Sequence, residues 1–380
     1  MKIQKIINIA FLIIYFIFFK YKNFFKNRKQ KTNKILIIQL DNLGDFIIFN
    51  NFILNFKEIY KKKEVFFLAK SEWSNFLKDH FENVIDFDEK RFLNDQLYCL
   101  KIIKELYKNK FEIVFNPNPS KIFLGDLFFF FSNSNRKIHQ QKYEIYSSFF
   151  LKLISKEIKL PESEKHELKI YSNFFKKIFT KEMLNGHLLN NPENSFSGSK
   201  VSLPQTISNN KYVVFSFFSG NIRKDWPLDR YVEIVKLVQK SGYKCVIVGL
   251  ENEYEIVSRH LDQVSNIINL CGKTNLSEVL KIIQNSRFII SNDTAIAHMA
   301  KIYNKDFVCI LSGVDFGKYF PYGDESNNQI IIHKKNWECF NCNWNCKYKL
   351  HKNDAFPCIS EIQTFEINEA VNKLLNNDNK

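Results

Sequence analysis

Acidic, hydroxyl and imidazole side chains occur together in the stretch Arg287–Ala300, RFIISNDTAIAHMA. Phe288–Asn292 has the apolar pattern of a buried parallel strand, and a short apolar helix follows Asp293 and Thr294. The N-terminus of such a helix can bind phosphate, because its N–H groups are unpaired and its dipole is positive there. Thr294 adds a hydroxyl, and His298 lies four residues later on the same helix face. An N-cap and a packed histidine would explain the same residues in isolation.

A basic loop, Ser219–Pro227, follows the predicted strand Tyr212–Phe217 and precedes the predicted helix Leu228–Gln239. Lys224 in this loop could meet a phosphate, and Arg223 is its rival. An isolated basic loop is more often solvated surface, so this assignment depends on what lies at the neighbouring strand ends.

Carboxylates follow the next predicted strand, Lys244–Val248. A carboxylate in this place often accepts hydrogen bonds from ribose hydroxyls, and Glu251, Glu253 and Glu255 compete for that role. A lysine, a helix N-terminus and a carboxylate together suit a nucleoside diphosphate. Neither G-x-x-x-x-G-K-[ST] nor G-x-G-x-x-G occurs, which disfavours ATP hydrolysis and dinucleotide redox chemistry.

A second acidic turn lies near the start of the chain, after the predicted buried strand Lys34–Leu40. Gly44 permits a tight turn into the predicted helix Phe46–Tyr60, and Asp45 sits at the N-terminus of that helix. Open α/β sheets bind ligands at the carboxyl ends of their strands, which is where this turn falls. Asp45 is therefore a candidate catalytic residue, Asp41 is a near competitor, and an N-cap is the structural alternative.

The remaining sequence alternates strand and helix patterns, which predicts an α/β fold. The further predicted elements are strands at Glu64–Ala69, Val84–Phe87, Phe111–Phe115, Ile267–Leu270 and Phe307–Leu311 and helices at Phe92–Tyr107 and Leu276–Gln284. From Gln140 to Lys181 the pattern is mostly helical, and Ile122–Phe131 fits either a buried helix or one that faces a membrane.

The length of 380 residues suggests two domains, and the formal net charge of +15 implies a polyanionic neighbour. A phosphorylated substrate and an anionic membrane are the main candidates, because no zinc-finger, RNP-type or helix-turn-helix pattern indicates nucleic acid. The 39 phenylalanines, with many Ile, Lys and Asn residues, suggest a coding bias, so no single Phe or Lys carries much weight.

The segment Ile6–Phe19 is apolar except for Asn8, and its heavier basic flank lies on the C-terminal side. It is shorter than the roughly 20 residues of a spanning helix, and no small-residue cleavage site follows it. A spanning helix and a helix lying in the membrane interface both fit, with a buried core helix as the alternative. We expect membrane association, with the body of the chain on the cytoplasmic side.

Four late cysteines form the pattern Cys339-x2-Cys342-x3-Cys346-x11-Cys358, with His351 as a spare ligand. Together they could give four thiolates to one structural Zn²⁺. Free structural thiols in a reducing compartment are the alternative, since the pattern does not look like a secreted disulfide framework.

Several stretches together resemble glycosyltransferase family 9, which contains the ADP-heptose:lipopolysaccharide heptosyltransferases. They are ILIIQLDNLGDFIIF, KDWPLDRY, VGLENEYE and GKTNLSEVLKIIQNSRFIISNDTAIAHMA, with the late cysteines. The resemblance implies a GT-B fold, in which two Rossmann-like domains face a cleft and a C-terminal helix crosses back. The expected parts are a membrane-associating segment at 1–31, an acceptor domain at 32–185, a linker at 186–210, a nucleotide-sugar domain at 211–365 and a C-terminal helix and tail at 366–380.

The resemblance also implies inverting sugar transfer that needs no catalytic metal or other cofactor. Asp45 matches the family's catalytic aspartate and would act as general base on the acceptor hydroxyl. Lys224 matches the lysine that contacts the donor phosphates. Glu253 is the best match for the ribose-binding glutamate, and Thr274 matches a position that lines the base pocket.

The family's donor-binding motif, D-[ST]-G-x-x-H, matches Asp293, Thr294 and His298. This chain departs from the motif at Ala295, where the family usually has glycine. A methyl group at that position could hinder close approach of the backbone to the diphosphate.

The resemblance favours transfer of a sugar, heptose from ADP-heptose, to a lipopolysaccharide or lipooligosaccharide core acceptor that carries lipid A and Kdo. The enzyme would work at the cytoplasmic face of the bacterial inner membrane, without nucleic acid as a partner. One alternative is transfer of another nucleotide-activated sugar to a different cell-surface glycan. A second is a non-catalytic scaffold that binds glycolipid or a partner protein.

Overall fold

A computed structural model describes residues 32–118, 123–140, 156–158, 164–179, 207, 211–348, 350–351 and 353–376. The chain forms two compact units. The first comprises Met1–Glu164 and Lys169–Asn190, and the second comprises Lys165–Leu168 and Asn191–Lys380. The predicted membrane segment and all of the predicted linker except Ile207 lie outside the described residues. In the described ranges, no helix is both long and apolar enough to cross a membrane.

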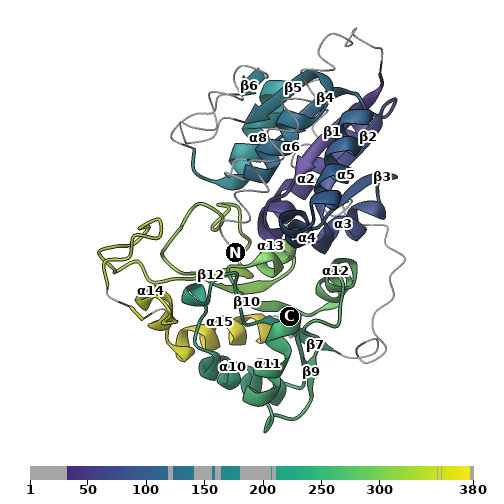
Figure 1. Cartoon of the computed structure of the whole chain (residues 1–380). Helices are drawn as coiled ribbons and strands as arrows, with labels where there is room; N and C mark the ends of the chain where they lie inside the picture. The colour runs from purple at the N-terminus through teal and green to yellow at the C-terminus, as the bar shows by residue number, and fades with distance from the viewer. Residues whose placement is uncertain are drawn as a thin grey trace. The chain divides into compact units, whose positions relative to one another are not determined.

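The first unit contains a parallel sheet in the order β3-β2-β1-β4-β5-β6, drawn from purple to teal in Figure 1. Its strands are β1 Lys34–Gln39, β2 Glu64–Lys70, β3 Asn83–Phe87, β4 Phe111–Asn116, β5 Ser134–Gln140 and β6 Lys156–Ile158. Its helices are α2 Leu43–Ile59, α3 Ser71–Lys78, α4 Glu89–Asn94, α5 Gln96–Lys108, α6 Phe123–Phe131 and α8 Glu167–Ile178, the last from Lys169 on.

The second unit contains a parallel sheet in the order β12-β11-β10-β7-β8-β9. Its strands are β7 Tyr212–Ser216, β8 Lys244–Ile247, β9 Ile267–Asn269, β10 Ile289–Asn292, β11 Phe307–Ile310 and β12 Gln329–Ile332. Its helices are η2 Ile222–Lys224, α10 Leu228–Lys240, η3 Glu251–Glu253, α11 Tyr254–His260, α12 Leu276–Asn285, α13 Ala295–Ile302, α14 Pro357–Ser360 and α15 Thr364–Asn376.

Each sheet has the strand order of the doubly wound Rossmann type. In the first unit the chain reverses its direction across the sheet between β1 and β4, and in the second unit between β7 and β10. Loops diverge at such a switch point and leave a crevice at the carboxyl ends of the strands. The topology therefore identifies one candidate ligand edge in each unit.

Aromatic side chains form much of the core of the first unit. Phe52 of α2 stacks on Phe175 of α8 at 4.7 Å and 7°, and Phe56 meets the same ring edge-on at 5.1 Å. In α6, Phe128 and Phe129 are fully buried. The described part of the segment Ile122–Phe131, for which the sequence left two interpretations, is thus a helix with buried side chains in this core.

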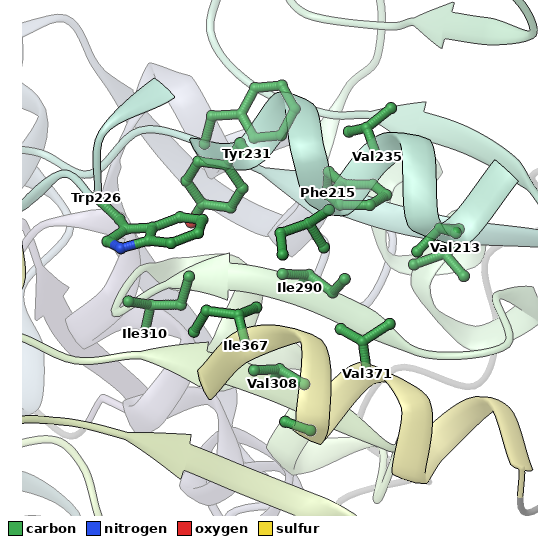
Figure 2. Close-up of a cluster of buried hydrophobic side chains, with 14 of the residues drawn as sticks. Val213, Phe215, Trp226, Tyr231, Val235, Ile290, Val308, Ile310, Ile367 and Val371 are labelled. Atoms are coloured by element: carbon green, nitrogen blue, oxygen red, sulfur yellow. The ribbon is translucent and has the colours of Figure 1, made fainter. Parts of the chain in front are cut away.

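The core of the second unit joins one face of the sheet to α10 and α15, which also pack against each other (Figure 2). Ile290 and Val308 come from the central strands, and α15 contributes Ile367 and Val371. The predicted C-terminal helix therefore exists, and its apolar face is buried within the second unit.

Some predicted elements differ from the structure. The single helix predicted at Phe92–Tyr107 is two helices, because Asp95 leaves helical geometry with φ −120° and ψ 104°. The carboxylate of Asp95 accepts a 3.0 Å hydrogen bond from the N–H of Tyr98 and so caps α5. The region predicted as mostly helical contains the strand β6, and the strands β5 and β12 and the helix α3 were not predicted.

Candidate functional site

Lys224 and two aspartates form a buried ionic cluster at the switch point of the second unit. The Nζ atom of Lys224 lies 3.0 Å from Oδ2 of Asp293 and 3.4 Å from Oδ1 of Asp315. These side chains are 10%, 4% and 5% exposed, respectively. The structure thus brings together the predicted Lys224 and Asp293 and adds Asp315, which the sequence analysis did not single out.

Burial and charge act against each other in this cluster. Burial alone would lower the pKa of Lys224, but Asp293 and Asp315 outweigh it and hold that pKa above its ordinary value. Burial raises the pKa of Asp315, with Lys224 opposing it. Burial would also raise the pKa of Asp293, but Lys224 and His298 keep it low. At neutral pH the cluster therefore holds a charged amine between carboxylates.

Asn292, the last residue of β10, fixes the loop that carries Lys224. Its Nδ2 donates to the carbonyl of Phe217 at 2.6 Å. Its Oδ1 accepts from the N–H of Trp226 at 3.2 Å and from the hydroxyl of Tyr231 at 3.1 Å. One buried amide therefore ties β7, the Lys224 loop and α10 to the strand that precedes Asp293.

His298 is held in place from several sides. Its Nδ1 lies 3.0 Å from the hydroxyl of Tyr322, and its Nε2 lies 3.6 Å from Oδ1 of Asp293. Its ring stacks on Phe320 at 4.7 Å and 7°. Burial lowers the pKa of His298 to about 4, with Asp293 opposing the shift. The imidazole is therefore neutral at pH 7 and positions Asp293 rather than supplying charge.

The N-terminus of α13 adds hydrogen-bonding groups to the cluster. Thr294 is the N-cap, and its Oγ1 accepts from the N–H of Ile296 at 3.2 Å. Ala295 is the first helical residue and is half-buried. The predicted helix start is thus confirmed, and the dipole of α13 points its positive end toward the residues beside Asp293.

The glutamates after β8 differ in their environment. Glu251 and Glu255 are exposed, whereas Glu253 is half-buried and its Oε2 accepts from the N–H of Leu250 at 2.8 Å. Burial raises the pKa of Glu253. A Cβ atom at Gly249 would lie only 2.1 Å from that Oε2, so a larger residue there would displace the carboxylate from this position. Of the three competing glutamates, Glu253 is the one that the fold positions.

Thr274 lies at the end of the loop that follows β9. It is half-buried and directly precedes Asn275, the N-cap of α12. Asn275 forms a capping box with Glu278, which fixes the start of the helix. Thr274 and Glu253 therefore belong to the loops of β9 and β8, on one side of the Lys224 cluster.

Arg223, the rival of Lys224, points elsewhere. Its guanidinium carbon lies 5.4 Å from the ring centre of Phe356, and its Nη2 donates to the carbonyl of His351 at 3.5 Å. Lys224 is accordingly the basic side chain of this loop that meets Asp293.

Asp45 lies in the first turn of α2 in the first unit and is 7% exposed. Its competitor Asp41 is 1% exposed, and its Oδ2 accepts from Nε2 of Gln39 at 3.4 Å and from the hydroxyl of Tyr171 at 3.2 Å. The helix begins at Leu43, three residues earlier than predicted, so Asp45 stands inside the first turn rather than before it.

The four late cysteines surround one small cavity of about 10 Å³. All are free thiols, and burial raises the pKa of Cys358 to about 11. Gly313 donates its N–H to Sγ of Cys358 at 3.3 Å. Within the described part of the chain, no group of three or more His, Cys, Asp or Glu side chains could hold a metal ion. The structural zinc is not confirmed and stays a prediction.

The site includes residues that the sequence analysis missed. Asp315 follows β11 at the same sheet edge as Asp293, which is a signal that the strand pattern contained. Tyr322 and Trp344 come from later loops with no regular pattern, and only their contacts with His298 and Lys224 reveal them.

The sequence profile of glycosyltransferase family 9 (heptosyltransferase) matches residues 100–350. Lipooligosaccharide heptosyltransferase 2 of Haemophilus influenzae is 28% identical over 104 residues, which are 26% of this chain and 30% of that protein. Lipopolysaccharide heptosyltransferase 2 of Escherichia coli is 27% identical over 92 residues, 23% of this chain and 26% of that protein. These matches span less than a third of the length of either relative.

Solved structures match over nearly the whole chain. ADP-heptose lipopolysaccharide heptosyltransferase II of E. coli superposes with a TM-score of 0.64 at 17% identity, covering 91% of this chain and 100% of that one. A family 9 glycosyl transferase from Veillonella parvula gives 0.69 at 16% identity, covering 92% and 99%. The likeness shows a GT-B-like α/β fold, and with the profile match over most of its length, the chain belongs to glycosyltransferase family 9.

Proposed function

We propose that this chain is an inverting glycosyltransferase that moves heptose from ADP-heptose to a lipopolysaccharide or lipooligosaccharide core acceptor. The observation that carries the proposal is the Lys224 cluster beside the N-terminus of α13, at the switch point of a Rossmann-type sheet. An amine and a helix N-terminus there suit a nucleoside diphosphate. The heptosyltransferase relatives support the choice of sugar and acceptor.

In the proposed reaction, Asp45 accepts the proton of the acceptor hydroxyl while its oxygen attacks the anomeric carbon of the donor sugar. The new bond forms as the bond between that carbon and the phosphate oxygen breaks. ADP leaves with the bonding electron pair, and Lys224 and α13 stabilise its negative charge. The proposed reaction includes no catalytic metal, as the resemblance to the family implies.

The remaining donor roles follow the loops of the second unit. Glu253 would accept hydrogen bonds from the ribose hydroxyls, and Thr274 would line the base pocket. His298 would hold Asp293 so that Asp293 in turn positions the amine of Lys224. Ala295 would bring a methyl group near the diphosphate, where the family motif has glycine.

The proposal places the enzyme at the cytoplasmic face of the inner membrane. It rests on the apolar sequence at residues 6–19 and on the net charge of +15, which suits phosphorylated lipid A and Kdo carboxylates.

The first test is calorimetric binding of ADP, UDP, GDP and CMP to the full chain. Thr294→Val is the informative variant, because it removes one hydroxyl and leaves the ionic cluster intact. Selective ADP binding that weakens in this variant supports the donor site. Selective UDP or GDP binding keeps the transferase but removes the heptose assignment, and no nucleotide binding would favour the scaffold alternative.

A further inference from the structure

Trp344 is a large apolar residue that stands exposed beside the Lys224 cluster. Trp344 is 44% exposed, whereas Trp73 and Trp226 are almost fully buried. The Nζ atom of Lys224 lies 5.8 Å from the centre of its ring, and the ring meets Phe356 edge-on at 6.0 Å. The indole therefore borders the candidate diphosphate site and keeps open surface for a ligand.

The backbone holds Trp344 in an unfavourable conformation. Its φ is +72°, and Asn341 and Asn343 also have positive φ values of 61° and 48°. Left-handed backbone is uncommon for a bulky residue and is energetically unfavourable. Such strain persists only where the surroundings determine the conformation.

Hydrogen bonds tie the residues before Trp344 to the neighbouring loop. Asn341 donates its N–H to the carbonyl of Gly313 at 2.6 Å, and Asn343 donates to Val314 at 2.8 Å. Gly313 and Val314 are the two residues before Asp315, which forms an ion pair with Lys224. A Cβ atom at Gly313 would lie 2.7 Å from the ring of Phe340, so glycine is needed for this close approach. The loop that carries Trp344 is thus attached directly to the segment that carries Asp315 of the ionic cluster.

The strand order shows which part of a donor would meet Trp344. Parallel strands end at one edge, so loops follow one another along it in the order of the sheet, β12-β11-β10-β7-β8-β9. Glu253 and Thr274 follow β8 and β9, and Lys224 follows β7 in the middle. Trp344 lies in the loop that is hydrogen-bonded to Gly313 and Val314 after β11, on the opposite side. A nucleoside held by Glu253 with its diphosphate at Lys224 therefore extends its sugar toward Trp344.

We propose that Trp344 is a specificity-determining residue that packs its indole face against the transferred sugar of the nucleotide donor. The inference rests on the proposed function. The face of an indole is apolar and carries negative potential, so it suits the C–H groups of a sugar ring. It also suits the positive charge that develops at the anomeric carbon during transfer.

The test compares ADP with ADP-heptose as calorimetric probes on the full chain. Trp344→Ala is expected to weaken ADP-heptose binding about tenfold and to leave ADP binding within about twofold. Trp344→Phe, which keeps an aromatic face, is expected to retain most of the affinity. Tyr348→Ala is the matched control, because Tyr348 lies exposed in the same loop but packs edge-on against Trp337 at 5.0 Å.

Equal weakening of ADP and ADP-heptose by Trp344→Ala, or no change in either, overturns the inference while leaving the donor site in place. Failure of the unmodified chain to bind either probe overturns the proposed function itself. Indole fluorescence gives a second readout if the alanine variant misfolds. Emission is expected to change more with ADP-heptose than with ADP, and this difference should disappear in Trp344→Phe.

Discussion

The two units share one strand order but carry different chemistry at their switch points. In the first unit, Asp41 is bonded to Gln39 and Tyr171, and Asp45 lies nearby in the helix start. In the second, Lys224 sits between two carboxylates beside a neutral imidazole. The topology thus fixes where a ligand can bind, and the side chains that follow each strand decide which chemistry occurs there.

Among the variants that distinguish the two units, Asp45→Asn is expected to have the largest effect, a loss of sugar transfer. It keeps the shape of the side chain but removes the base, so sugar transfer should fall about 10²–10⁴-fold while ADP affinity stays within about twofold. Activity on a Kdo-bearing acceptor and calorimetry measure the two quantities. Loss of transfer in Asp41→Asn but not in Asp45→Asn would reverse the assignment within the first unit.

Lys224→Met tests the ionic cluster of the second unit. It leaves Asp293 and Asp315 buried without their cation, which should lower the free energy of unfolding by about 3–5 kcal/mol in urea titrations. Adding Asp315→Asn should recover part of that loss. Lys236→Met, on the exposed face of α10, is the control and should change stability by less than about 0.5 kcal/mol. Equal stability of Lys224→Met and Lys236→Met would show that the cluster is not buried in solution.

His298 gives the second unit a pH dependence. Its pKa of about 4 in the folded chain lies below the ordinary value of 6.5, so the unfolded chain binds the proton more readily. Stability is therefore fully present above pH 6.5 and falls as the pH drops toward 4, by at most about 3 kcal/mol. His298→Gln should flatten this part of a plot of melting temperature against pH. An unchanged slope would assign the dependence to other groups.

The smallest effects come from a matched pair of hydroxyl deletions, one in each unit. Tyr171→Phe removes a hydrogen bond to the side chain of Asp41, which is 1% exposed, and should cost about 1–3 kcal/mol, because losing a partner is costly for a buried acceptor. Tyr322→Phe removes a partner of neutral His298 and should cost about 0.5–1.5 kcal/mol. Urea titrations of both variants compare the units directly, and the reverse order would contradict the larger effect expected in the first unit.

The sequence predicted the central strands well, because parallel strands buried on both faces are continuous apolar runs. It missed β5 and β6, whose sequences SNRKIHQ and KEI are largely polar, and it merged α4 with α5, since the cap at Asp95 interrupts a continuous apolar period. Asp293 and Lys224 stood out by their position after strands. The partnership of Lys224 with Asp315 joins residues 91 apart in the chain, and only the folded sheet reveals such a pairing.

Asn292 has a consequence for how the donor site opens and closes. Its side-chain amide is hydrogen-bonded to the Lys224 loop, to α10 and to Phe217 after β7, which lie 61 to 75 residues away from it in the chain. The conformation of this loop therefore depends on β10. A loop that is held in this way is expected to unfold only together with the central sheet. The backbone amide of Trp226, although it lies in a loop, should thus exchange its hydrogen with solvent as slowly as the amides of the core strands.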